Sequence, residues 1–206
     1  MEKIDFKKEL KHLYKPSAKK VEWVEVPPMN YLMVDGLGAP GSQSYQEALE
    51  SLFPMAYGLK FSIKKELEID YTVMPLEGLW WAEDYHAFTM DGRRDEWKWT
   101  MMIMQPEWIT AERVEAMRED VRKKKNPAAL HLLRFESYAE GKAAQTMHIG
   151  PFSEEGPTIE RVHETIENDG FSLSGKHHEI YLSDIRRADP AKWKTVLRQP
   201  ATKGKS

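Results

Sequence analysis

The alternation of apolar and polar residues is clearest between residues 145 and 187, where it predicts a strand, a tight turn, a helix and a second strand. Met147 and Ile149 alternate with polar neighbours, as in a half-buried strand. Pro157 suits a first helical turn, and the apolar residues after it recur at i, i+3 and i+7. Gly170 follows as a helix stop signal. This stretch therefore predicts one strand-helix-strand unit.

The second strand of this unit separates two kinds of side chain. Ile180 and Leu182 point to one face and Glu179 and Tyr181 to the other, because successive residues of a strand project to opposite sides. If the helix covers the face of Ile180 and Leu182, the acid and the phenol look away from the helical layer. They would then line a groove or meet water.

Two carboxylates in this unit are candidates for a ligand site. In one interpretation Glu179 lies on the floor of a ligand cleft, and Glu154 or Glu155 reaches it from the start of the helix. In the other, the helix dipole favours a carboxylate near its N-terminus, and a glutamate on an open sheet face is simply solvated. Spacing alone leaves both interpretations open.

The rest of the chain predicts further helices and strands. An apolar stripe among lysines over residues 4–14 predicts a helical docking arm. A long helix is expected from Ser42 or Ser44, which Pro54 kinks, ends or divides, and another over residues 110–125. The predicted strands form three hairpins and a final strand: residues 21–26 with 29–37, 70–81 with 96–105, 130–137 with 143–149, and 195–198.

One order of elements, a hairpin, a turn, a helix and two strands, occurs in both halves of the chain. We therefore predict an α+β fold, a tandem pair of strand-helix-strand-strand modules with pseudo-twofold symmetry around a central ligand cleft. The predicted single domain over residues 1–206 consists of an N-terminal arm 1–20, a first module 21–105, a crossover helix 108–125 and a second module 130–200.

Tryptophans are concentrated in the hairpin predicted over residues 70–105. Trp80 and Trp81 are neighbours in a strand and must point opposite ways, so at least one is expected to face a groove. Trp99 shares a strand face with other large residues, which a packed core would also explain. Because aromatic walls suit flat apolar ligands, all three are candidate ligand contacts.

Composition argues against several classes of function. The net charge is −3 and the Lys and Arg residues are dispersed, which disfavours nucleic-acid binding. No cysteine is present, so thiol nucleophiles and thiolate metal sites are excluded. The N-terminus lacks a signal-peptide apolar region, and no run approaches the ~20 apolar residues of a membrane helix. We expect a cytoplasmic protein with no membrane partner.

Neither a cofactor nor a metal is expected. The glycine-rich segment GLGAPG, residues 36–41, departs from the dinucleotide fingerprint and lacks a following GKS/T. His177 and His178 precede Glu179, yet adjacent strand residues face opposite ways. The three therefore cannot form one compact metal triad.

The sequence resembles the GyrI-like small-molecule-binding domains, in the subgroup of stand-alone proteins of about this length. The resemblance rests on IDFKKELKHLY, VPPMNYLMVDGLGAPG, MHIGPFSEEGPTIERVH and HHEIYLSDIRRADPAKWKTVLRQP. It covers nearly the whole chain and implies the tandem-module fold predicted above. It also implies that the glutamate on the strand matching Glu179 lies in the ligand cleft.

Some stand-alone members that this chain resembles detoxify xenobiotics by hydrolysing reactive cyclopropane-bearing, DNA-alkylating compounds. They use cleft glutamates and aromatic walls. The resemblance carries the catalytic role to Glu155 and Glu179, and the aromatic walls to Trp80 or Trp81 and to Tyr71 or Tyr181.

Two other classes of function stay open. A non-catalytic module that sequesters or senses apolar cations would also use a buried Glu179, since such pockets pair a carboxylate with aromatic walls. A protein-interaction role, such as toxin or gyrase modulation, rests on family analogy alone. As a hydrolase or a binder, the chain is expected to take a flat aromatic small molecule and to be a monomer or a weak homodimer.

Overall fold

The computed structural model describes residues 2–83 and 93–204. The chain divides into two compact units that are interleaved in sequence. The first comprises residues 1–6, 29–74 and 80–138, and the second comprises residues 7–28, 75–79 and 139–206. Strand β5 (Leu76–Trp81) and the short helix α1 (Phe6–Glu9) contribute residues to both. No helix in the described part of the chain combines the length and apolar character needed to cross a membrane.

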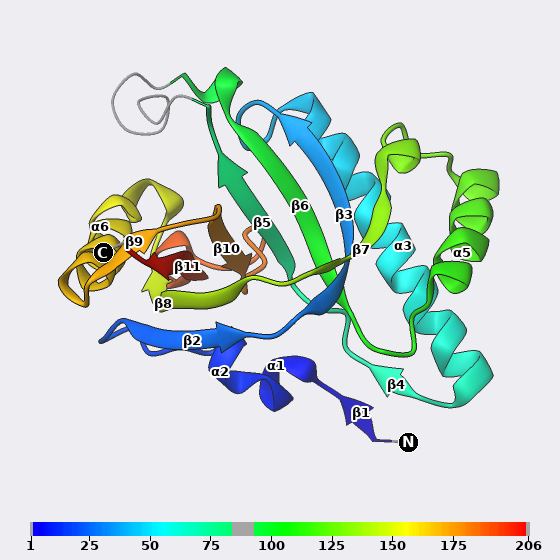
Figure 1. Cartoon of the computed structure of the whole chain (residues 1–206). Helices are drawn as coiled ribbons and strands as arrows, with labels where there is room; N and C mark the ends of the chain where they lie inside the picture. The colour runs from blue at the N-terminus through cyan, green and yellow to red at the C-terminus, as the bar shows by residue number, and fades with distance from the viewer. Residues whose placement is uncertain (1, 84–92, 205–206) are drawn as a thin grey trace. The chain divides into compact units, whose positions relative to one another are not determined.

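The first unit is a layer of antiparallel strands with helices packed on it (Figure 1). Its strands run in the order β5-β6-β3-β7, and a separate two-residue parallel pair joins β1 to β4. Helix α3 packs on β3 and β6, and α5 packs on α3. The bounds are β1 Lys3–Ile4, β3 Met29–Leu37, α3 Gln43–Leu67, β4 Asp70–Tyr71, η1 Arg94–Glu96, β6 Lys98–Gln105, α5 Ala111–Lys124, η2 Leu130–Leu132 and β7 Arg134–Tyr138.

Local signals explain the two long helices of this unit. The Ser42 hydroxyl accepts a hydrogen bond from the Tyr45 backbone N–H at 3.4 Å, and the Thr110 hydroxyl does the same for Arg113 at 3.3 Å. The predicted helices at both places are confirmed. Helix α3 continues through Pro54 to Leu67, so the proline does not end it.

The second unit has strands in the order β2-β8-β11-β10-β5, and β9 pairs with the far end of β11. Helix α6 packs on β8, β9 and β11 (Figure 1). The predicted strand-helix-strand unit is confirmed here. The bounds are α2 Lys11–Tyr14, β2 Glu22–Val26, β8 Gly141–Ile149, η3 Phe152–Glu154, α6 Gly156–Asn168, β9 Phe171–Leu173, β10 His177–Tyr181, η4 Pro190–Lys192 and β11 Lys194–Lys203.

Two of the three predicted hairpins are wrong. The strand at 22–26 pairs with β8 rather than with β3, and the strand at 134–138 pairs with β3 rather than with β8. Pro27-Pro28 lacks two backbone N–H groups, which removes the hydrogen bonds that a tight hairpin turn needs. Segments near in sequence thereby join different units. The neighbouring positions of β5 and β6 agree with the remaining hairpin. The predicted strand 70–81 is nevertheless divided, because β4 pairs with β1 and only β5 lies beside β6.

The α+β class is confirmed by these elements. The N-terminal arm is helical only in short pieces, since α1 and α2 are separated at Leu10. The predicted module boundaries, 21–105 and 130–200, stay predictions.

Candidate functional site

Glu155 is held at the start of α6 by the turn that precedes it. Gly150 adopts a φ of 134°, a conformation open to glycine, and ends β8. The Glu155 N–H then donates to the Phe152 carbonyl at 3.2 Å, and its carbonyl accepts from Ile159 at 2.9 Å. Its side chain makes no capping bond to the helix and is 7% exposed. The neighbouring Glu154 is exposed, so the burial of Glu155 decides between the two candidates for a buried acid.

Glu179 lies in β10, and each of its carboxylate oxygens has a partner on the same strand. His177 Nε2 is 2.9 Å from Oε1, and the Tyr181 hydroxyl donates to Oε2 at 2.8 Å. Residues two apart in a strand share a face, which explains why these three side chains meet. The Glu179 side chain is 13% exposed, so the carboxylate is largely but not completely shielded.

The two glutamates contact each other and have opposite pKa shifts. Burial raises the pKa of Glu155, and the charge of Glu179 and a hydrogen bond to it raise that pKa further. Burial alone would raise the pKa of Glu179, but hydrogen bonds from His177, Glu155 and Tyr181 lower it below its usual value. The pair therefore holds one neutral carboxyl group and one carboxylate. Oε1 of Glu155 is buried without a hydrogen-bond partner among the described residues.

Aromatic side chains lie beside this pair. The Phe152 ring packs edge-on against Tyr181, with centroids 5.8 Å apart, and tilted against Trp193 at 5.0 Å. Trp193 is held in place because its indole N–H donates to the Ala188 carbonyl at 3.0 Å. Phe152 is 38% exposed and directly precedes the turn that carries Glu155. Tyr181 thus connects the carboxyl pair to a cluster of rings, of which Phe152 is exposed to solvent.

The helix covers the opposite face of β10 from the one expected. Glu179 pairs in register with Leu197, and cross-strand neighbours share a face. Leu197 and His177 line a small hollow together with Ile159, Val162 and His163 of α6. Helix α6 therefore lies over the Glu179 face, and the expectation that this acid looks away from the helical layer is wrong.

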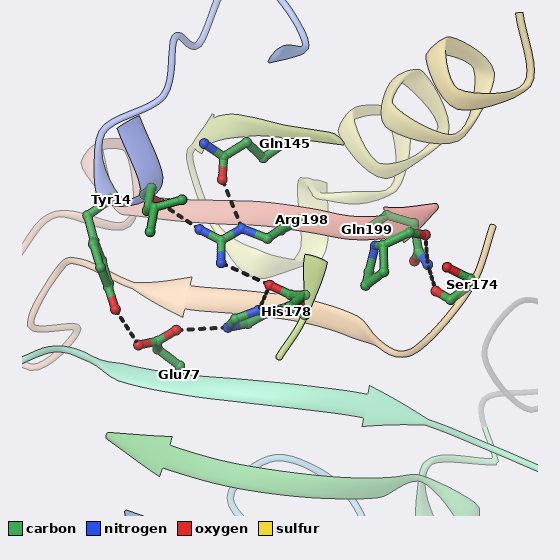
Figure 2. Close-up of polar contacts among 10 residues, drawn as sticks. Tyr14, Glu77, Gln145, Ser174, His178, Arg198 and Gln199 are labelled. Carbon is green, nitrogen blue, oxygen red and sulfur yellow. Dashed lines mark hydrogen bonds and ion pairs between the residues drawn. The ribbon is translucent and has the colours of Figure 1, made fainter. Parts of the chain in front are cut away.

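The other face of β10 carries a buried polar network, defined here as Tyr14, Glu77, Glu140, His178 and Arg198. Figure 2 shows Tyr14, Glu77 and His178 joined in one chain of hydrogen bonds. The tyrosine hydroxyl donates to Glu77 Oε2 at 2.9 Å, and Glu77 Oε1 is 2.9 Å from His178 Nε2. His178 Nδ1 is 2.8 Å from Glu140, whose Oε1 also accepts from Arg198 at 3.0 Å.

The network pairs two acids with two basic side chains. Burial lowers the pKa of His178, but the charge and hydrogen bond of Glu140 and the hydrogen bond of Glu77 raise it to about 9 overall. Burial raises the pKa of Glu140, but His178 and Arg198 together lower it to about 2. Arg198 also donates to the Gln145 side chain at 2.9 Å and to the Leu13 carbonyl at 2.7 Å. The network therefore ties the N-terminal segment to the strands.

Three of the predicted aromatic contacts lie in the first unit in packed surroundings. Trp99 is fully buried: its ring contacts Tyr45 edge-on at 5.7 Å and lies so close to Gly36 that an added Cβ would be 2.1 Å from it. Trp80 is 5% exposed and stacks on Tyr45 at 6.4 Å. Tyr71 is 2% exposed, and burial raises the pKa of its hydroxyl. Core packing accounts for the burial of all three.

Trp81 is half-buried at the end of β5. Of the predicted site residues, the structure brings Glu155, Glu179 and Tyr181 together in the second unit. The predicted contacts Tyr71, Trp80, Trp81 and Trp99 lie in the first unit, and all the assigned roles stay predictions.

Sequence reasoning missed His177, Phe152 and Trp193 as neighbours of the carboxyl pair. The signal for His177 was present, since it lies two residues before Glu179 on the same strand face. Phe152 is close to Glu155 in sequence and Trp193 is far from it, but nothing in the sequence indicated that their rings pack together or against Tyr181. Within residues 2–83 and 93–204, no three His, Asp or Glu side chains are grouped so that they could hold a metal ion.

Comparison with known proteins bears on the whole chain. The model of the GyrI-like small-molecule-binding domain matches residues 19–200. An uncharacterized conserved protein from Listeria innocua is 43% identical over 97% of this chain and 100% of its own, with a TM-score of 0.89. A hydrolase from Listeria innocua is 41% identical over 97% and 100% of the two chains, with a TM-score of 0.84.

The EcmrR C-terminal domain is similar in fold alone, at 13% identity and a TM-score of 0.55, over 90% of this chain and 98% of that domain. No match is found among the curated proteins. These likenesses confirm the predicted fold.

Proposed function

The chain belongs to the family of GyrI-like small-molecule-binding domains, and from that premise we propose that it binds flat apolar molecules and opens an activated cyclopropane in them by adding water. A relative at 41% identity is described as a hydrolase, which supports a hydrolytic activity. The proposed substrates are electrophilic, DNA-alkylating xenobiotics. No cofactor enters the proposed reaction.

The main support is the protonation of the carboxyl pair. A neutral Glu155 can give a proton, and an ionised Glu179 can take one, as general acid and general base catalysis require. The unpartnered Oε1 of Glu155 leaves one buried oxygen open to a ligand or to water.

The reaction balances with these two groups. Glu179 takes a proton from water as the water oxygen bonds to a ring carbon of the strained cyclopropane. The ring C–C bond breaks, and its electron pair moves into the conjugated carbonyl. Glu155 gives its proton to that carbonyl oxygen. The hydrogen bond between the two glutamates then returns a proton from Glu179 to Glu155, so the pair is reset without an external acid or base.

Aromatic side chains would hold the flat part of the substrate. Tyr181 donates to Glu179 and packs against Phe152, which in turn packs against Trp193. The earlier candidates Trp80, Trp81, Trp99 and Tyr71 remain proposed contacts from the first unit. Stacking on such rings favours planar apolar molecules over flexible polar ones.

The test is turnover of a cyclopropane alkylator by Glu179→Gln. We expect turnover to fall ~10²-fold or more, because an amide cannot take the proton, while a flat aromatic ligand keeps most of its affinity. The matched control is Glu154→Gln, which removes a nearby exposed carboxylate and should turn over substrate normally. Unchanged hydrolysis in Glu179→Gln would contradict the proposed role.

A second candidate function is binding of organic cations without catalysis. A carboxylate bonded to Tyr181, whose ring packs with Phe152 and Trp193, also suits a cation, which both the charge and the rings attract. In that case Glu179→Gln should lower affinity for cationic aromatics and hardly change it for neutral ones. Loss of cation affinity with no turnover by the unchanged protein would favour this candidate.

A further inference from the structure

Both oxygens of the Glu179 carboxylate are hydrogen-bonded to side chains of the same strand. His177 contacts Oε1 at 2.9 Å from the residue two before it, and Tyr181 contacts Oε2 at 2.8 Å from the residue two after it. A carboxylate with a donor on each oxygen has a fixed plane, because rotation about its last bond would break both contacts. The orientation of the proposed base is therefore set within β10.

We infer that His177 is a positioning residue, which fixes the orientation of Glu179 and maintains its negative charge. This inference rests on the proposed function, in which Glu179 is the base. Tyr181 is a neutral donor, whereas His177 can carry a positive charge when it is protonated. A charged donor stabilises a carboxylate more strongly than a phenol does.

His177 also borders helix α6. It lines a small hollow together with Ile159, Val162 and His163 of α6 and Leu197 of β11. Its Nε2 contacts Glu179. The same imidazole ring therefore borders both the hollow and the proposed base.

Other titratable and charged groups lie near Glu179 or His177, and their contacts differ from those of His177. Glu155, at the start of α6, shares a hydrogen bond with Glu179 that lowers the pKa of Glu179 and so favours its negative charge. His163 of α6 lines the same hollow, and burial and the charge of His177 lower its pKa. Arg198 of β11 also borders the hollow, but its guanidinium binds Glu140, Gln145 and the Leu13 carbonyl.

The decisive variant is His177→Phe, which keeps a flat ring against the hollow and removes both ring nitrogens. The Glu179 carboxyl carbon can be followed by 13C NMR in glutamate-labelled protein, assigned by its absence in Glu179→Gln. We expect its titration midpoint to rise by about one pH unit or more in His177→Phe. The control is His131→Phe, which makes the same change at an exposed imidazole and should leave the midpoint unchanged.

Kinetics provide an independent measurement with a cyclopropane alkylator. In His177→Phe we expect kcat to fall ~10-fold or more and the acid limb of its pH profile to move upward, with KM nearly constant. His177→Gln restores an N–H donor and should recover part of the loss. A variant with an unchanged Glu179 titration and an unchanged pH profile, and only a lower melting temperature, would overturn the inference.

The two measurements separate the possible failures. If the unchanged protein hydrolyses no activated cyclopropane, the proposed function fails. The NMR titration still tests whether His177 stabilises the charge of Glu179. If hydrolysis occurs and the titration midpoint does not move in His177→Phe, the inference about His177 fails and the proposed function stands.

Discussion

A pair of acids is buried on each face of β10, but the pKa shifts of Glu140 on one face and Glu155 on the other are opposite. On one face His178 and Arg198 lie against Glu77 and Glu140, and the pKa of Glu140 falls to about 2. On the other face Glu155 meets Glu179, and the pKa of Glu155 rises. His178 lies on the first face and Glu179 on the second, although the two residues are adjacent in the chain.

The difference shows that burial alone does not decide whether an acid is ionised. Burial raises the pKa of both Glu140 and Glu155, but Glu140 has two basic partners and Glu155 has another acid. Balanced charge makes the polar network a structural anchor, whereas unbalanced charge leaves a proton in the carboxyl pair. A proton held beside a carboxylate is what acid and base chemistry needs.

The largest expected effect is on the balanced face. Glu140→Gln removes the acid that His178 and Arg198 share and leaves two buried cations with one carboxyl group between them. We expect the free energy of unfolding to fall by ~3–5 kcal/mol, measured by urea denaturation. The control is Glu115→Gln, which breaks the exposed pair with Arg118 and should hardly change it.

A loss in Glu140→Gln no larger than that of the control would show that the balanced network is not an anchor. The comparison between the two faces of β10 would then rest on pKa shifts alone.

A smaller effect is expected from pH. The pKa of His178 is raised from 6.5 to about 9, so its contribution to stability is complete below pH 6.5 and is lost as the pH rises through 9. The free energy of unfolding should therefore fall by on the order of 2–3 kcal/mol between these pH values. In His178→Gln this decrease should be absent, and an equally steep decrease there would assign it to another group.

An effect of similar size is expected at Glu155, where removing the acid should stabilise the fold. Because the pKa of this acid is raised in the folded state, it opposes folding as the pH rises above 4.5, where the unfolded chain ionises it. Glu155→Gln should therefore raise the free energy of unfolding at neutral pH by on the order of 2–3 kcal/mol and flatten its decrease with pH. A clear loss of stability would mean that Glu155 is an ionised anchor like Glu140.

Patterns within one segment predicted much of the fold. The stretch from β8 through α6 to β10 follows from alternation, from a proline at the start of the helix and from Gly170 at its end. Strand partners did not follow, because hydrogen bonds between strands depend on segments far apart in sequence. The pairing of residues 22–26 with β8 is the clearest case.

The candidate site divides in the same way. The positions of Glu179 and Tyr181 on one strand face follow from a spacing of two, and the same spacing indicates His177. The sequence does not show which of Glu154 and Glu155 is buried, since both lie at the same helix start. In the folded chain, after the turn at Gly150, Glu155 is buried and Glu154 is exposed.

The sequence by itself determined the elements, the family and the acids that could meet. Tertiary structure alone decided which face of β10 lies under α6 and which acids have cations beside them. The physical reason is range: side-chain alternation and helix signals act over a few residues, whereas a pKa depends on every charge brought within a few ångströms by folding. Glu140 lies between two strands and Glu155 at a helix start, and only their folded neighbours make one an anion and the other an acid.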